Sequence, residues 1–83
     1  MAKIIKYGAS WCGPCRQETE NLQESKIPFE EVDIDSNSSV VSEKGIKTIP
    51  FLEFYKNDTD KVPTKTHSGL LTTKEIIEIC ESL

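Results

Sequence analysis

Two cysteines, Cys12 and Cys15, lie three positions apart in the stretch ASWCGPCRQ. A cysteine thiolate is the nucleophile in disulfide exchange and is also a zinc ligand, so the spacing suits a redox centre or half of a metal site. A zinc site usually adds a second cysteine pair or a histidine pair, and the remaining His67 and Cys80 supply neither. Unless a partner chain completes a zinc site, the pattern favours redox chemistry with no metal.

The segment after the first cysteine is compatible with a helix from Cys12 to about Ser25, and its few apolar residues predict a narrow buried stripe of Cys15, Thr19 and Leu22. Pro14 falls in the first turn of that helix, where its missing N–H costs nothing. Cys12 then lies at the positive end of the helix dipole, beside unpaired N–H groups that favour an anion. Cys15 lies within reach of it but one turn deeper. This arrangement predicts that Cys12 attacks a substrate disulfide and that Cys15 resolves the resulting mixed disulfide.

Length and composition limit the remaining function classes. The 83 residues predict one domain, spanning 1–83. A net charge of −4 and scattered lysines argue against nucleic-acid binding, because phosphate contacts need clustered basic residues. No stretch approaches the roughly 20 apolar residues of a membrane span, and the first residues lack the apolar run of a secretion signal. Three cysteines are too few for a disulfide framework, so we expect a cytoplasmic, reducing location and no membrane association.

The elements that position the cysteine pair alternate along the chain. Short β-branched and aromatic runs predict strands, whereas capping residues and apolar residues at helical spacing predict helices. Strands joined by a helix should be parallel with a right-handed crossover, and the last two strands, joined by a short turn, antiparallel. The predicted fold is α/β with the order βαβαββα, a four-stranded mixed sheet with helices on both faces. The expected strands are 3–7, 27–35, 49–55 and 61–68, and the expected helices are 12–25, 36–45 and 72–83.

The WCGPC stretch, placed after a short strand and at the start of a helix, resembles the thioredoxin family. KGIKTIP at 44–50 is similar to the family's pattern before its cis-proline, and Gly69 matches the glycine that follows the last strand. The resemblance covers essentially the whole chain, although the extra N-terminal strand and helix of full-length thioredoxins are missing. The chain therefore resembles a minimal thioredoxin fold, close in size to glutaredoxins and to the small thioredoxins of phages and archaea.

The resemblance implies a protein-disulfide reductase, a thioredoxin-like electron carrier that holds no cofactor. It implies that Pro50 is cis and faces the cysteine pair, which would leave the Ile49 backbone free to pair with an extended substrate chain. The implied electron donor is an NADPH-dependent thioredoxin reductase, ribonucleotide reductase is one implied client, and we expect a monomer. The implied docking surface around Cys12 consists of Trp11, Gly13, Pro14, Ile49, Pro50 and Gly69.

One departure from the family pattern concerns the position six residues before the first cysteine. The family keeps a buried acid there, which helps to move a proton at the second cysteine, and a lysine near it on the next strand. The present sequence has Lys6 and Glu31 at these two positions. Because an unpaired buried lysine is costly, we expect Lys6 to pair with Glu31 rather than to extend into solvent. Glu31 would then exchange the proton of Cys15, and Lys6 would stabilise a nearby thiolate.

Two other functions are compatible with the sequence. A glutaredoxin reduced by glutathione fits the short length, and the TIP sequence at 48–50 resembles the T-V-P of glutaredoxins. Against it, WCGPC replaces the usual C-P-Y-C, and Gly69 is followed by Leu70 and Leu71 instead of the glutaredoxin G-G-x-D run. The second alternative, of a different class, is a thioredoxin-fold binding subunit whose cysteines are incidental. Full function after replacement of both cysteines by serine would favour that class.

Overall fold

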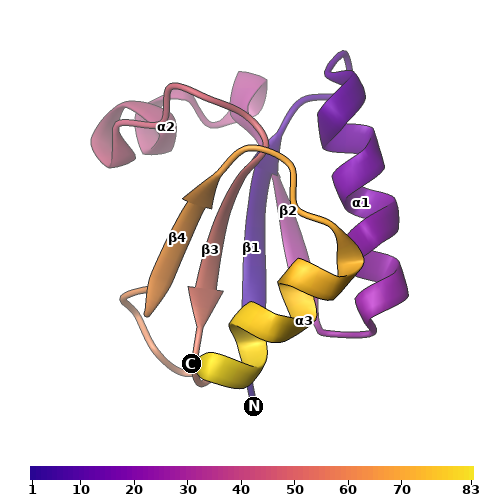
Figure 1. Ribbon diagram of the computed structural model, residues 1–83. Helices are drawn as coiled ribbons and strands as arrows, with labels where there is room; N and C mark the ends of the chain where they lie inside the picture. Colours follow the sequence, from indigo (N-terminus) through magenta and orange to yellow (C-terminus); the bar gives the residue numbers. More distant parts are fainter.

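The predicted order βαβαββα is confirmed by a computed structural model that describes all 83 residues (Figure 1). A single turn of 3₁₀ helix, Ile34–Ser36, is the one element that the sequence did not predict. No helix of the protein combines the length and the hydrophobicity that a membrane span requires. The elements are β1 (Lys3–Gly8), α1 (Gly13–Ser25), β2 (Phe29–Asp33), α2 (Ser38–Lys44), β3 (Phe51–Tyr55), β4 (Lys65–Ser68) and α3 (Thr73–Ser82).

The four strands form one mixed sheet in the order β2-β1-β3-β4. Strand β1 runs parallel to β2 and antiparallel to β3, and β3 runs antiparallel to β4. Strand β1 is therefore central, as expected, and its carboxyl end leads directly into the cysteine pair. The register places Lys6 opposite Glu31 on β2.

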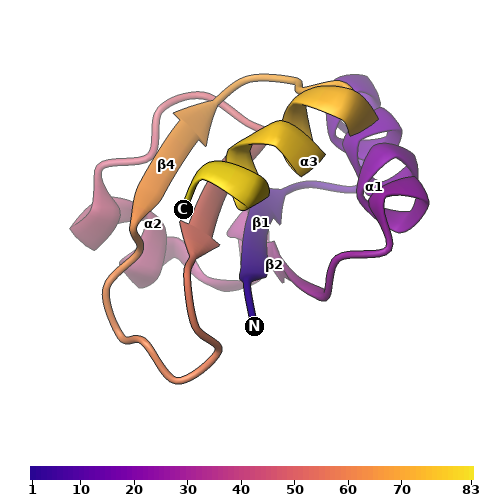
Figure 2. The same ribbon diagram turned by 60° about the horizontal axis from the view of Figure 1, so that its bottom comes forward.

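The sheet has two differently covered faces. Side chains alternate across a strand, so one set of positions in β1 and β3 faces α1 and α3, and the other set faces α2. Figure 2 shows α1 and α3 on one side of the sheet and α2 on the other. The helices on both faces that the sequence predicts are thus confirmed. The main core lies under α1 and α3 and consists of Ile4, Leu22, Leu52, Phe54, Leu71 and Ile76.

Three predicted strands are wrong at their ends, each for a local reason. The strand predicted at 27–35 ends at Asp33, because its side chain accepts the N–H of Asp35 at 3.0 Å and starts the 3₁₀ turn. The strand predicted at 49–55 begins only at Phe51, since Pro50 has no N–H to give to a ladder. The strand predicted at 61–68 begins at Lys65, after Pro63, for the same reason.

Capping residues confirm the predicted helix ends except the start of the helix predicted at 36–45, which begins at Ser38 because Ser36 belongs to the 3₁₀ turn. Pro14 lies in the first turn of α1, with Cys12 as the N-cap. Gly45 ends α2 in the left-handed region with φ of 65°, a conformation that glycine adopts at low cost. Thr72 caps α3 and forms a capping box with Glu75: each side chain accepts the other residue's backbone N–H.

The buried face of α1 differs from the prediction. The sequence suggested a narrow stripe of Cys15, Thr19 and Leu22, but Thr19 is only half-buried and Glu18 is fully buried. The Glu18 carboxylate accepts the backbone N–H of Leu71 at 2.8 Å, and Asn21 donates to the carbonyl of Leu71 at 2.8 Å. A buried acid in α1 therefore holds the segment between β4 and α3 against this helix.

Candidate active site

Cys12 is the N-cap residue of α1, at the end of the connection from β1. Its Sγ accepts the backbone N–H of Cys15 at 3.2 Å, and its own N–H donates to the carbonyl of Ala9 at 3.2 Å. The first turn of a helix leaves N–H groups without intrahelical partners and carries the positive end of the dipole. The position of Cys12 at the start of the helix, which the sequence predicted, is confirmed.

Cys15 lies one turn deeper and is 1% exposed. It packs with Ala9 and Cys12 in a small cluster that Ile34 and Ile49 partly cover. Burial, with a smaller contribution from the hydrogen bond to Cys12, raises the pKa of the Cys15 thiol to about 11, while the charge of Lys6 acts in the opposite direction. Both thiols are free. The two sulfurs thus differ in environment: one faces a helix end and the other is kept protonated by burial.

Gly8, the last residue of β1, makes the close packing of Cys15 possible. A Cβ atom at this position would lie 3.0 Å from the Cys15 sulfur and 3.4 Å from Cε of Lys6. Any side chain there would push the second cysteine away from the sheet. The sequence analysis missed this residue, although a glycine at the end of a strand pattern is a known sign of close backbone approach.

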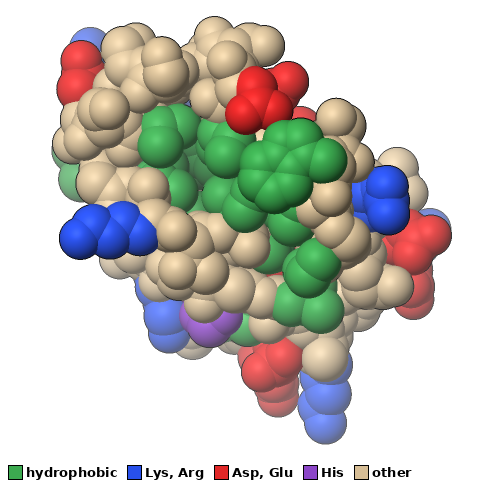
Figure 3. Space-filling model, turned by 90° about the horizontal axis from the view of Figure 1, so that it is seen from above, with side chains coloured by type: hydrophobic (Ala, Val, Ile, Leu, Met, Phe, Trp, Pro, Cys, Tyr) green, Lys and Arg blue, Asp and Glu red, His purple; other side chains and the backbone are tan.

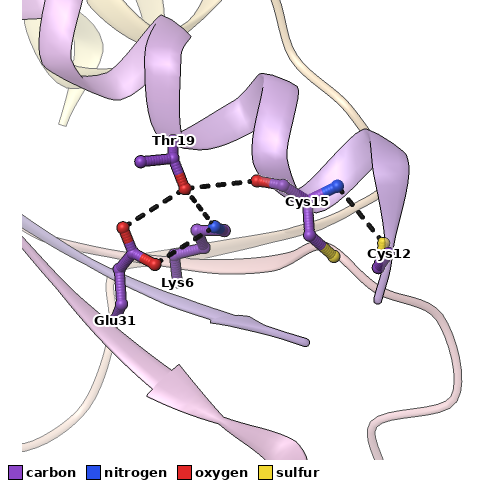
Figure 4. Close-up of polar contacts among 5 residues, drawn as sticks. All are labelled: Lys6, Cys12, Cys15, Thr19 and Glu31. Atoms are coloured by element: carbon purple, nitrogen blue, oxygen red, sulfur yellow. Dashed lines mark hydrogen bonds and ion pairs between the residues drawn. The ribbon is translucent and has the colours of Figure 1, made fainter. Parts of the chain in front are cut away.

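Lys6 and Glu31 form the ion pair that the sequence predicted (Figure 4). The Lys6 ammonium lies 3.4 Å from Glu31 Oε2, with side chains that are 5% and 47% exposed respectively. The alternative in which Lys6 extends into solvent is wrong. Lys6 also donates to the hydroxyl of Thr19 on α1. The buried cation is therefore paired and hydrogen-bonded, as a charge at this depth requires.

Thr19, which the sequence analysis assigned only to the packing face of α1, connects this ion pair to the cysteine helix. Its hydroxyl lies 3.2 Å from Glu31 Oε1 and 3.3 Å from the carbonyl oxygen of Cys15. A hydroxyl has one proton, so it donates to only one of these acceptors at a time while it accepts from Lys6. Thr19 follows Cys15 by four residues, one helical turn, and this spacing was the sequence signal for the contact between its hydroxyl and the Cys15 carbonyl.

A pocket of about 260 Å³ opens beside the cluster, between α1 and β2. Lys6, Gly8, Thr19 and Glu31 are among its lining residues. A volume of this size has room for several water molecules, since each occupies about 30 Å³ in the liquid. Water in this pocket has access to Lys6, Thr19 and Glu31, whereas Cys15 is not among the lining residues.

The predicted docking residues gather at the end of the sheet around Cys12, where Figure 3 shows hydrophobic side chains collected on one face. Trp11 is 66% exposed and its Nε1 donates to Asp35 at 2.8 Å, so the indole is held outside the core. Gly13 and Pro14 are exposed beside it. Ile49 packs against the cluster of the two cysteines.

Pro50 and Gly69 lie at the other side of this surface, but the Pro50 side chain is fully buried, so it supports the surface from beneath and is not one of the exposed docking residues that the resemblance implied. The Ile49–Pro50 bond is cis, as the resemblance implied, and the carbonyl of Pro50 accepts the N–H of Gly69 at 2.8 Å. Gly69 has φ of 102°, a conformation that favours glycine. Leu70, which the prediction did not include, adds an exposed apolar side chain. The structure thus brings the predicted docking residues together, whereas Lys6 and Glu31 lie behind Cys15.

No group of three or more histidine, cysteine or acidic side chains is arranged to hold a metal ion.

The sequence was compared with protein-family models and with curated proteins. The model described as thioredoxin matches residues 1–82. A protein named thioredoxin from Rickettsia bellii is 32% identical over 81 residues, which cover 90% of this chain and 74% of that protein. A thioredoxin from Rhodospirillum rubrum is 31% identical over 84 residues, covering 94% of this chain and 78% of that protein. These similarities favour thioredoxin-type redox chemistry over a glutaredoxin or a non-redox binding subunit.

Solved structures agree with the fold. The crystal structure of chloroplastic thioredoxin z superposes with a TM-score of 0.87 over 99% of this chain and 77% of that chain, at 24% identity. At that identity the likeness bears on the fold alone, and it confirms the minimal arrangement of four strands and three helices.

Proposed function

Since the chain belongs to the thioredoxin family and is a thiol–disulfide oxidoreductase, we propose that Cys12 is its attacking thiolate and Cys15 its resolving thiol. One observation carries this assignment: Cys12 is the N-cap residue of α1, whereas Cys15 lies one turn further into the helix and is almost fully buried. Cys12 caps a helix that favours an anion, whereas burial raises the pKa of Cys15. The thiolate is the reactive form, so the first attack belongs to Cys12.

The proposed reaction proceeds in two exchange steps. The Cys12 thiolate attacks one sulfur of a substrate disulfide; the substrate S–S bond breaks, a Cys12–substrate disulfide forms, and the other substrate sulfur leaves as a thiolate that takes up a proton. Cys15 then loses its proton and attacks the Cys12 sulfur. The mixed disulfide breaks, the second substrate sulfur leaves and is protonated, and a Cys12–Cys15 disulfide remains. Two electrons have passed from the protein dithiol to the substrate.

Membership of the family implies protein substrates that contain disulfides. We propose that they dock on the apolar surface around Cys12, with an extended segment paired to the backbone of Ile49, a form of strand addition. The exposure of Trp11 and Leu70 supports this, because an apolar patch that leads to a reactive group is typical of a docking site. Ribonucleotide reductase is one client that the proposal includes.

The proposed electron donor is an NADPH-dependent thioredoxin reductase in a reducing, cytoplasmic environment. The test is insulin-disulfide reduction with NADPH and thioredoxin reductase, measured beside a second reaction with glutathione and glutathione reductase. We expect turnover in the first reaction and little in the second. Turnover only with glutathione would establish the glutaredoxin alternative. No turnover in either reaction, nor with dithiothreitol, would remove the proposed activity on protein disulfides.

We also propose that Glu31 exchanges the Cys15 proton with solvent and that Lys6 stabilises the Cys15 thiolate as it forms. The Lys6–Thr19–Glu31 cluster, its contact with the Cys15 carbonyl and the adjoining pocket support this role. The cation lowers the pKa of Cys15, against the larger effect of burial. The positive charge of Lys6 thus assists deprotonation of Cys15, the resolving thiol.

Two substitutions test this role. Glu31→Gln should reduce the turnover of the folded protein by roughly a hundredfold, the loss expected for a missing general base. The free energy of unfolding should also fall, because Lys6 keeps its bond to Thr19 but loses its charged partner, so turnover is compared per folded molecule. The matched control is Glu30→Gln, on the adjacent β2 residue that faces the opposite side of the sheet. Lys6→Met should move alkylation of Cys15 to higher pH in a Cys12→Ser background. Unchanged kinetics in Glu31→Gln would remove Glu31 from the mechanism.

A further inference from the structure

Helix α2 has no fully buried side chain, yet it directly precedes the segment that carries Ile49 and Pro50. Figure 1 shows it set to one side of the sheet, apart from α1 and α3. Most helices in globular proteins are held by an apolar face packed on a core. Some other interaction must therefore fix the end of α2 on the sheet.

Glu53, in the middle of β3, provides that interaction. Its carboxylate is almost fully buried on the α2 face and accepts three hydrogen bonds. Tyr7 and Tyr55 donate their hydroxyls to Oε1 at 2.7 and 3.0 Å, and the Lys44 ammonium donates to Oε2 at 2.8 Å. No buried side-chain polar atom in the protein lacks a hydrogen-bond partner. The buried acid is thus fully satisfied, and one of its three donors comes from α2.

Lys44 is the last residue of α2. Its bond to Glu53 therefore joins the C-terminal end of this helix to the middle of β3. Its side chain is 34% exposed, and its ammonium also lies 5.9 Å from the centre of the Tyr7 ring. The two tyrosines orient the carboxylate from within the sheet, since both belong to strands that pair with one another. Burial and the nearby carboxylate raise the pKa of Tyr55 to about 12, which keeps its hydroxyl a donor at neutral pH.

We infer that Glu53 is a positioning residue for the docking of protein disulfides. Through Lys44 it fixes the end of α2, and with it the following segment from Gly45 to Pro50, whose Ile49 packs against the cluster of Cys12 and Cys15. The other end of that segment is already held, because the Pro50 carbonyl accepts the N–H of Gly69. The inference rests on the proposed docking of substrates at Ile49.

The two kinds of disulfide substrate separate this role from chemistry at the cysteines. A small aromatic disulfide such as 5,5′-dithiobis(2-nitrobenzoate) needs only access to the Cys12 sulfur. A protein disulfide also needs Ile49 in place beside it. A displaced α2 end therefore weakens binding of the protein substrate and leaves the intrinsic reactivity of Cys12 unchanged.

The experiment compares Glu53→Gln and Lys44→Met with the natural protein on insulin and on the small disulfide. Glutamine keeps an oxygen for the two tyrosines but places an NH₂ group opposite Lys44, so Glu53→Gln breaks mainly the link to α2. We expect KM for insulin to rise roughly three- to tenfold in each variant, with kcat and the rate with the small disulfide unchanged. The double variant should show no further increase, because both changes remove the same bond.

Lys74→Met is the control, since Lys74 is an exposed lysine on α3 with no side-chain hydrogen bond or ion pair. Lys44→Met keeps the test available if Glu53→Gln does not fold, because Lys44 is partly exposed. An unchanged KM in Lys44→Met overturns the inference, as does an equal loss of rate on both substrates. If the natural protein reduces the small disulfide but not insulin, the proposed function fails instead, and the two failures are distinguishable.

Discussion

The two faces of the sheet are built from different chemistry. Under α1 and α3, β1 and β3 contribute Ile4, Leu52 and Phe54 to a core of apolar side chains. On the α2 face, the next residues along the same strands include Glu53 and Tyr55, which meet through hydrogen bonds. Apolar burial stabilises without strong directional preference, whereas a satisfied buried carboxylate fixes its partners in one geometry. One face therefore supplies most of the stability, and the other positions the docking segment.

The largest effect should come from the apolar face. Phe54→Ala removes a fully buried ring and should lower the free energy of unfolding by about 3–5 kcal/mol. Urea unfolding followed by circular dichroism measures this change. Val62→Ala is the control, because Val62 is exposed in the loop between β3 and β4, and it should change stability by less than about 0.5 kcal/mol. A loss below about 1 kcal/mol in Phe54→Ala would contradict the assignment of stability to this face.

A smaller effect is expected one residue further along β3, on the opposite face. Tyr55→Phe removes a hydroxyl that donates to Glu53 and keeps the ring, so it should cost about 1 kcal/mol. The same unfolding measurement applies, and activity on insulin should persist because Lys44 still holds the carboxylate. A loss of unfolding free energy as large as that of Phe54→Ala would mean that the hydrogen bonds to Glu53 stabilise the fold as much as the apolar core does.

The smallest expected effect concerns Glu18, the polar exception on the apolar face. Burial raises its pKa, opposed by the Leu71 N–H, Asn21 and the charge of Lys6; Glu75 adds to the rise. A folded-state pKa above the unfolded value of about 4.3 means that the folded state binds the proton more tightly. This contribution to stability is present at low pH and is lost as the pH rises through the raised pKa.

Glu18→Gln removes that titration and keeps an acceptor for the Leu71 N–H. The variant should therefore gain stability relative to the natural protein as the pH is raised from about 4 to about 7. Urea midpoints at several pH values measure the difference. A difference that stays constant with pH, or that changes in the opposite direction, would show that burial does not raise the pKa of Glu18.

The sequence predicted the fold and the cysteine site well because their signals are local. A helix that starts at Cys12 with Pro14 in its first turn fixes where the first sulfur lies, and capping residues mark the other helix ends. The parallel and antiparallel strand directions followed from the type and length of the connections. Strand ends were less predictable, since a single hydrogen bond at Asp33 or a proline without an N–H decided them.

The two buried acids were missed because their partners are distant in sequence. Glu18 lies three residues after Cys15 and so shares its helix face, but its bond to Leu71 spans 53 positions. Glu53 lies two residues from Phe51 and two from Tyr55, which places all three side chains on one face of β3. Nothing in the local sequence shows that Lys44 and Tyr7 contact Glu53 there. Charge complementarity across strands did predict the Lys6–Glu31 pair, where family resemblance supplied the second position.

The central claim, that Cys12 attacks and Cys15 resolves, is tested most directly by trapping the mixed disulfide. Reduced Cys15→Ser and Cys12→Ser proteins, both with Cys80→Ser to leave one thiol each, are mixed with insulin and analysed by mass spectrometry without reductant. The account predicts a covalent insulin adduct through Cys12 in the Cys15→Ser protein and almost none in the Cys12→Ser protein at neutral pH. An equal or faster adduct through Cys15 would contradict it.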